Sequence, residues 1–254
     1  MSTLKKDLEP GLPPLLPETK TVMDTLMAAD IVKKALQLAV DQDAKCLEEQ
    51  IAITETPSSP FGEEIRGKDF VERFKELGLL DVHMDEVGNV LGLRPGVGPE
   101  PRTKLIISAH LDTVFAKDTN FKVRRDGNRY YAPSIGDDSR GLAGLLQVIR
   151  MFQELKIETE GDILFVATVG EEGEGDLRGV KHLFRDPNVD VDAFISLDWC
   201  DPSDAIVGAT GSLRYRVSFD GPGGHSYLGF GQPSAIHALM RTGKVLCDLE
   251  VPKD

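Results

Sequence analysis

The chain has 254 residues, of which 41% are hydrophobic and 28% are charged. These fractions are ordinary for a soluble globular protein, and the length suits one large domain or one domain with part of another. The 29 basic and 42 acidic residues give a formal net charge of -13 at pH 7. Because this surplus repels polyphosphates, it argues against nucleic acid as a partner.

Cysteine usage and the lack of long apolar runs bear on the compartment. Cys46, Cys200 and Cys247 are odd in number and widely separated, which predicts reduced thiols rather than a disulfide framework. No stretch approaches the ~20 apolar residues of a membrane span. The N-terminal segment also lacks the apolar core of a secretion signal. We therefore expect a cytoplasmic protein with no membrane partner.

The N-terminal part of the chain is expected to be helical after a short lead. Residues 1–20 are rich in proline and predict a disordered segment. Spaced apolar residues over 22–50 are typical of one or two amphipathic helices, and helical spacing returns at 68–77. Prolines and serines within 54–62 indicate a loop between them.

The middle of the chain alternates between apolar runs, typical of buried strands, and segments with helical spacing. We expect strands at 87–93, 104–109, 162–169 and 191–197, a hairpin at 121–131, and helices at 141–155 and 177–184. The turn of the hairpin is Asp126-Gly127-Asn128, which tolerates positive φ. This alternation predicts a layered α/β sheet.

Histidine and acidic residues follow three of the expected strands. His110 and Asp112 come after the strand at 104–109, Glu171 and Glu172 after the strand at 162–169, and Asp198 after the strand at 191–197. In open α/β sheets, ligands bind outside the carboxyl ends of the strands. We therefore expect these side chains to converge on one crevice.

Each group also has a plainer interpretation. His110 is either a metal ligand, with Asp112 orienting a neighbouring group, or a histidine hydrogen-bonded at a strand end. Asp137 and Asp138 precede the helix expected at 141–155, where carboxylates commonly cap helix N-termini. A carboxylate pair in such a loop is equally able to bridge two cations. The pair alone leaves both readings open.

The two adjacent glutamates are expected to have different roles. Glu171 and Glu172 follow eight mostly apolar residues, so at least one side chain should face the crevice. One glutamate can ligate a metal, while its unligated neighbour takes a proton from water activated by the cation. Glu174 and Asp176 lie in a glycine-rich stretch and are expected to be solvated charges.

Five motifs occur in order along the chain: SAHLDTV, IGDDSRG, TVGEEGEGDLRG, SLDW and FDGPGGHS. In this combination they resemble the M20 group of metallopeptidases and related amidohydrolases, and in particular its peptidase T-like branch. The similarity runs from about residue 22 to the end of the chain. Each motif is modest by itself, but five in the same order make a chance match improbable.

The resemblance implies a two-metal centre, with zinc as the expected cation and cobalt or manganese as alternatives. By the resemblance, His110 and Asp198 would bind opposite metals, Asp137 would bridge them, and Glu172 would be a further ligand. Asp138 would then be a supporting or capping residue, although the roles of the two aspartates could be reversed.

The resemblance also assigns catalytic roles. Glu171 would be the general base, and Asp112 would be the carboxylate behind the metal ligands. His225, in GPGGHS, matches a family histidine that stabilises the developing oxyanion, often across a dimer. Without the family context, we would read His225 as a histidine in a glycine-rich turn.

The implied fold is a layered α/β/α catalytic domain of the zinc-peptidase type, here over residues 21–210. Residues 211–254 would begin a smaller α+β, ferredoxin-like lid and dimerisation domain, with a strand at 212–219 and a helix at 233–248. Family members continue with the rest of the lid and one more metal-binding histidine. We therefore expect the ligand set of the second metal to be one short, and a homodimer only through a complete lid.

The expected function is metal-dependent hydrolysis of di- or tripeptides or related amide bonds. A deacylase of N-acyl amino acids is the rival within the enzyme class, because specificity in the family resides partly in the lid. From a different class, the chain would be a non-catalytic fragment that binds a metal or a family partner. Metal stoichiometry and the effect of Glu171→Gln on hydrolysis would discriminate between the enzyme and the fragment.

Overall fold

The computed structural model describes residues 16–185, 191–198, 205–208 and 211–250. The chain divides into two compact units, Met1–Ser203 and Asp204–Asp254. The domain boundary expected between 210 and 211 adjoins residues outside the described ranges, and it stays a prediction. Cys200 and most of the expected lead also lie outside them, whereas Cys46 is a buried free thiol and Cys247 an exposed one.

Three consecutive helices open the described chain: α1 (Pro17–Ala28), α2 (Asp30–Asp41) and α3 (Asp43–Glu55). One or two helices were expected over this stretch. The helices are interrupted at Ala29, whose ψ of 135° is extended, and at Gln42. Helix α1 starts at Pro17, inside the segment expected to be a disordered lead. Proline suits the first position of a helix, because its φ is already helical and its missing N–H is not needed there.

The central sheet has five strands in the order β1-β2-β6-β3-β7. Its strands are β1 (Leu80–Met84), β2 (Val90–Arg94), β3 (Lys104–His110), β6 (Asp162–Thr168) and β7 (Ala193–Ser196). Strand β3 is parallel to both β6 and β7, whereas β2 runs antiparallel to β6 and to β1. The four expected strands are confirmed. Strand β1 was not predicted, because a register shift and the positive φ of Asp81 interrupt its side-chain alternation.

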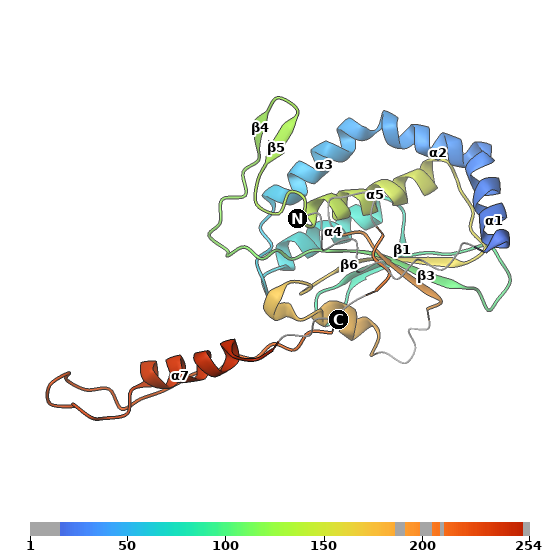
Figure 1. Ribbon diagram of the computed structural model, residues 1–254. Coiled ribbons are helices and arrows are strands. Elements are labelled where there is room, and N and C mark those ends of the chain that lie inside the picture. The colour runs from blue at the N-terminus through green and yellow to red at the C-terminus, as the bar shows by residue number, and fades with distance from the viewer. Residues whose placement is uncertain (1–15, 186–190, 199–204, 209–210, 251–254) are drawn as a thin grey trace. The chain divides into compact units, whose positions relative to one another are not determined.

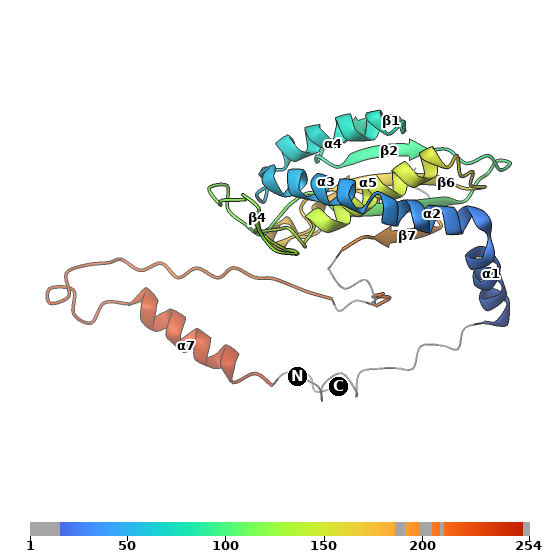
Figure 2. The ribbon, with the colours of Figure 1, turned by 90° about the horizontal axis from the view of Figure 1, so that it is seen from above.

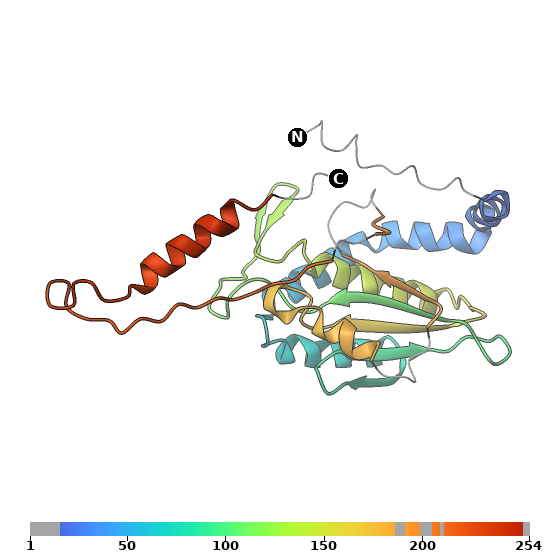
Figure 3. The ribbon, with the colours of Figure 1, turned by 60° about the horizontal axis from the view of Figure 1, so that its bottom comes forward.

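Helices cover both faces of this sheet, which confirms the α/β prediction. On one face, α3, α4 (Glu64–Glu76) and α5 (Ser139–Glu154) enclose the main core, and α2 packs beside α5 (Figures 1 and 2). The short α6 (Arg178–Leu183) lies on the other face (Figure 3). Its Leu183 is buried with Ile106 and Val166 of the strands. Side chains alternate accordingly, so that Ile107 faces the main core and Ile106 faces α6.

The expected hairpin is present as β4 (Arg124–Asp126) and β5 (Arg129–Tyr131). Its turn contains Gly127 at a φ of 60°, a left-handed conformation that glycine adopts without strain. The 3-10 turn η1 (Gly173–Gly175) lies between β6 and α6. None of the described helices is long and apolar enough to cross a membrane.

The second unit contains helix α7 (Ala235–Cys247), which confirms the helix predicted at 233–248. The side chain of Ser234 caps it by accepting a hydrogen bond from the backbone N–H of His237. The strand predicted at 212–219 is wrong, since these residues form no strand in the structure. A strand is stabilised by pairing, and the described residues of this unit include no second strand to pair with it.

Candidate metal centre

Strands β3 and β6 end side by side, and this brings two of the expected groups together. His110 is the last residue of β3 and lies opposite Thr168 in the parallel register. The backbone N–H of Leu111 then donates to the carbonyl oxygen of Thr168 over 2.7 Å. The segments that follow, with Asp112 on one and Glu171 on the other, therefore leave the sheet next to each other.

Asp112 connects these two segments. Its side chain is fully buried. Its Oδ1 accepts a hydrogen bond from the backbone N–H of Glu171 over 3.0 Å, and its Oδ2 accepts one from that of Glu172 over 2.9 Å. One carboxylate thus fixes the backbone of both glutamates. Imidazole Nδ1 of His110 lies 3.0 Å from the backbone oxygen of Asp112 and 3.6 Å from its Oδ1, so the backbone oxygen is the closer partner.

The two adjacent aspartates have separate tasks. Asp138 is the N-cap of α5, where its Oδ1 accepts from the backbone N–H of Gly141 over 3.0 Å. Its Oδ2 accepts from the backbone N–H of His110 over 2.8 Å, which ties the start of α5 to the end of β3. Asp137, joined to Asp138 by a cis peptide bond, is half exposed and places its Oδ1 2.9 Å from Nε2 of His110. The capping interpretation therefore holds for Asp138.

Three side chains meet in a geometry that can hold a cation. His110, Asp137 and Glu172 each offer one ligand atom, and these atoms all lie within 4.8 Å of one another. They come from the end of β3, the loop before α5 and the loop after β6. Within the described ranges, this is the one group of three or more histidine, cysteine or acidic residues with that spacing. An imidazole nitrogen with carboxylate oxygens is a donor set that suits zinc.

The electrostatics of His110 show how strongly this position favours positive charge. Burial alone would lower the pKa of its imidazole, but hydrogen bonds to Asp112 and Asp137, together with the charge of Asp138, raise the pKa to about 11. The pKa of Asp112 is lowered, because hydrogen bonds from His110 and from the backbone of Glu172 outweigh the effect of burial.

The pKa values of the two neighbouring glutamates are raised, in contrast to that of Asp112. Burial raises the pKa of Glu171, and the charges of Asp198 and Asp112 add to this. The pKa of Glu172 is raised as well, by burial and by the charge of Asp137. These groups gather more negative charge than His110 compensates, which is the condition under which a divalent cation is stabilising.

The remaining expected residues lie outside the three-ligand group. Asp198 is exposed just after β7, where its charge acts on Glu171 and on Asp138. His225 belongs to the second unit, and its Nδ1 accepts hydrogen bonds from the backbone N–H groups of Tyr227 and Leu228. Their roles as a metal ligand and as an oxyanion-stabilising residue stay predictions.

Two supporting residues escaped the sequence analysis. Asn89 is fully buried; its Oδ1 accepts from the backbone N–H of Val169, and its Nδ2 donates to the carbonyl oxygen of Gly179, so it holds both ends of the loop with the glutamates. Arg66 is fully buried in α4 and donates to the carbonyl oxygen of Leu111. A signal for Arg66 existed, because it precedes Phe70 and Phe74 at helical spacing on the apolar face of α4.

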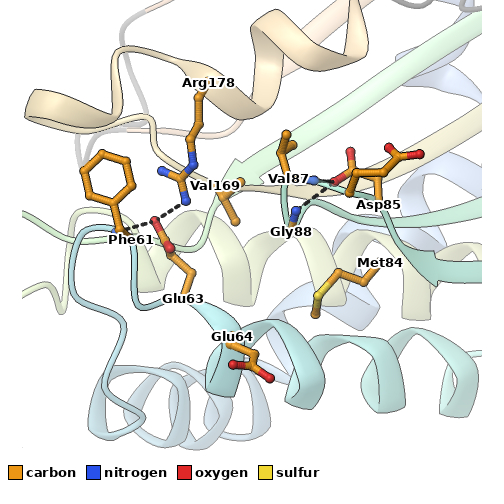
Figure 4. Close-up of a pocket in the computed structure, with 10 residues that line it drawn as sticks. Phe61, Glu63, Glu64, Met84, Asp85, Val87, Gly88, Val169 and Arg178 are labelled. Atoms are coloured by element: carbon orange, nitrogen blue, oxygen red, sulfur yellow. Dashed lines mark hydrogen bonds and ion pairs between the residues drawn. The ribbon is translucent and has the colours of Figure 1, made fainter.

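Figure 4 shows a separate cavity of about 290 Å³ between the start of α4, the end of β1 and Arg178. In it, Nη2 of Arg178 donates to Glu63 over 2.8 Å, and the guanidinium lies 4.8 Å from the ring centroid of Phe61. None of the described residues that line it is an expected site residue. Backbone N–H of Arg178 donates to the carbonyl oxygen of Gly170, so this ion pair supports the loop before Glu171.

Residues 106–243, more than half of the chain, match the model of peptidase family M20/M25/M40. The chain belongs to this family. The match, which begins within β3, covers all five sequence motifs, and it includes every residue predicted as a ligand or catalytic group.

Individual proteins are also similar to this chain. Carboxypeptidase G2 of Pseudomonas sp. (strain RS-16) is 24% identical over 240 residues, which is 90% of this chain and 56% of that protein. The crystal structure of aminopeptidase PepT from Bacillus cereus matches with a TM-score of 0.50 and 25% identity, over 60% of this chain and 42% of that one.

The fold is also that of a eukaryotic enzyme structure. Di-peptidase Dug1p of Saccharomyces cerevisiae matches with a TM-score of 0.60 over 85% of this chain and 52% of that one, at 15% identity. At this identity, the likeness concerns the fold alone. The chain spans about half the length of carboxypeptidase G2, which matches 90% of the residues of this chain.

Proposed function

We propose that this member of the M20/M25/M40 family is a metal-dependent hydrolase of peptide or related amide bonds. The observation that carries the proposal is the convergence of His110, Asp137 and Glu172, with Glu171 held beside them by Asp112. A buried histidine, a buried orienting aspartate and an adjacent glutamate at the same strand ends supply the ligand, orienting and proton-accepting groups of metal-assisted hydrolysis. The family match supports the same reaction class.

The donor set fits a divalent cation of the zinc type. Nδ1 of His110 lies 3.0 Å from the backbone oxygen of Asp112, and this contact fixes the ring so that Nε2 faces Asp137. His110, Asp137 and Glu172 would hold the ion. When bound, the cation supplies Lewis-acid polarisation of the amide carbonyl. We propose that the centre would take two zinc ions, with Asp198 as a further residue that would hold them; cobalt and manganese are the alternatives.

Residues of the chain then divide the remaining work. Glu171 accepts a proton on its carboxylate from the attacking water and transfers it to the leaving amine. Burial raises the pKa of this carboxyl group, which makes it a better proton acceptor than a solvated glutamate. Asp112 fixes the backbones of both glutamates, so that Glu172 can serve as a ligand while Glu171 serves as the base. His225 would stabilise the oxyanion.

The substrate class follows from the relatives. We propose small peptides, because proteins similar to this chain are named a carboxypeptidase and an aminopeptidase. Deacylation of N-acyl amino acids is the alternative within the same chemistry, since the site as described recognises an amide rather than a side chain. A cytoplasmic location belongs to the same proposal, as does a homodimer formed through the lid domain where that domain is complete.

The test combines metal content with one substitution. The purified chain should retain about two zinc ions per molecule and hydrolyse a panel of di- and tripeptides and N-acyl amino acids. Glu171→Gln should keep the metal and reduce turnover by roughly 10²–10⁴-fold. Glu174→Gln in the same loop, at an exposed position, is the matched control and should keep full turnover.

Each failure has a distinct meaning. A chain that binds zinc but hydrolyses nothing would favour the non-catalytic fragment with a metal-binding role. A chain that binds no zinc, or in which Glu171→Gln and Glu174→Gln have equal effects, would contradict the proposed function.

A further inference from the structure

Arg66 is a fully buried cation with neutral hydrogen-bond partners. Its Nε and Nη2 both donate to the carbonyl oxygen of Thr56, over 3.1 and 2.7 Å, and its Nη1 donates to the carbonyl oxygen of Leu111 over 2.7 Å. Among the described residues, no carboxylate lies within ion-pair distance of its guanidinium. A buried charge without a counterion is costly, so something must compensate this one.

The compensating charges are those of the metal centre. Burial lowers the pKa of Arg66 to about 10, and the carboxylates that act against this effect are Asp112, Asp138 and Asp69, in that order. Asp112 and Asp138 are themselves fully buried. Both face His110, and Arg66 adds a permanent positive charge that does not depend on the imidazole. The two aspartates therefore favour the charged form of Arg66.

The hydrogen bonds of Arg66 also fix geometry. Leu111 stands between His110 and Asp112, so its carbonyl group belongs to the peptide plane that leads into Asp112. Thr56 is the C-cap of α3, and its carbonyl oxygen lacks a partner within the helix. One planar guanidinium thus joins the end of α3, helix α4 and the exit of β3.

We propose that Arg66 is a positioning residue of the metal centre, which clamps the Leu111 carbonyl and places a fixed positive charge behind Asp112 and Asp138. This inference rests on the proposed function, because it concerns the same cation site. Arg66 touches neither the cation nor the substrate. It acts through the orientation of His110 and Asp112.

The test measures Co²⁺ binding to the full chain, by competition with a chelator and by the visible absorption of the bound ion. Arg66→Gln removes the charge and should weaken Co²⁺ binding by about 10- to 100-fold and alter the spectrum, as expected when a group behind metal ligands is lost. Arg66→Lys keeps the charge but not the planar fork, and it should recover part of the affinity.

Arg150 provides the matched control. It is also a buried arginine, it donates to Gln147 and Glu49, and it lies on α5 about 16 Å along the helix from Ser139. Arg150→Gln should lower the melting temperature and leave the Co²⁺ affinity and spectrum unchanged. Arg66→Gln should lower the melting temperature and should also change the Co²⁺ affinity and spectrum.

The outcomes separate the two proposals. Failure of the unaltered chain to bind Co²⁺ would contradict the proposed function itself. If the unaltered chain binds Co²⁺, an unchanged affinity and spectrum in Arg66→Gln would overturn the inference, and so would equal losses in Arg66→Gln and Arg150→Gln. Should Arg66→Gln not fold, Arg66→Lys compared with Arg150→Lys decides in the same way.

Discussion

Two histidines expected to carry chemistry have opposite surroundings. His110 ends a central strand, is 2% exposed and is surrounded by carboxylates that raise its pKa to about 11. His225 lies exposed in a glycine-rich turn of the second unit, where its ring accepts hydrogen bonds from the backbone just after it. Residue type and motif are enough to suggest that a histidine is functional. The charges around it, however, depend on which strand ends converge on it.

The helices of the two units differ in the same way. Helix α5 buries nine residues, five of which belong to the main core, whereas α7 buries none, although side chains cap both N-termini. Local sequence is therefore sufficient to form either helix. Burial against a sheet makes α5 part of the cooperative core, and substitutions in the two helices should have very different effects on stability.

The largest expected difference lies between His110→Ala and His225→Ala. Loss of an imidazole ligand should weaken Co²⁺ binding by about 100-fold or more, since removal of a group behind a ligand already costs 10- to 100-fold. His225→Ala should leave the affinity of the chain unchanged. Chelator competition measures both; equal affinities in the two variants would remove His110 from the site.

Truncation of core and exposed isoleucines tests the contrast between helices. Ile149 of α5 is completely buried, whereas Ile236 of α7 is 68% exposed. Ile149→Ala should reduce the free energy of unfolding by about 2–5 kcal/mol, because it leaves a cavity. Ile236→Ala should change it by less than about 0.5 kcal/mol. Urea unfolding checks both, and a comparable loss at Ile236 would mean that α7 is packed in solution.

The two helix caps give a smaller contrast. Asp138→Ala removes the cap of α5 and the acceptor for the backbone N–H of His110, so it should destabilise the first unit by about 1–2 kcal/mol. Ser234→Ala removes the cap of α7 and should leave the main unfolding transition in place. Differential scanning calorimetry distinguishes them; an unshifted transition in Asp138→Ala would argue against its capping role.

The smallest expected effect depends on pH. A hydrogen bond from the backbone N–H of Gly96, helped by Arg102, lowers the pKa of Asp162 at the start of β6. A lowered folded-state pKa contributes stability above the unfolded value of about 4, and this contribution is lost as the pH falls through the folded-state pKa. Wild type should therefore melt above Asp162→Asn at pH 6, and the two should converge towards pH 3.

Asp248 is the control for this pH dependence. It pairs with Lys244 on the exposed surface of α7 over 2.8 Å. Such pairs contribute little, so Asp248→Asn should follow the wild-type melting temperature between pH 3 and pH 6. A parallel shift in both variants would indicate a general charge effect instead of the Gly96 and Arg102 contacts.

Much of the first unit could be predicted because its signals are local. Apolar runs located β2, β3, β6 and β7, and the residues after three of these strands supplied the candidate ligands. Prediction failed where pairing decides the outcome. Strand β1 forms because β2 pairs with it despite its irregular register, and residues 212–219 form no strand although their pattern suited one.

By itself, the sequence determined β2, β3, β6 and β7 and the position of His110, Glu171 and Glu172 at strand ends, because hydrophobic periodicity is a local property. The roles of the two adjacent aspartates were decided only in three dimensions. Asp138 directs both oxygens to backbone N–H groups, while Asp137 faces His110. Hydrogen-bond partners distant in sequence decide such roles, and no local pattern records them.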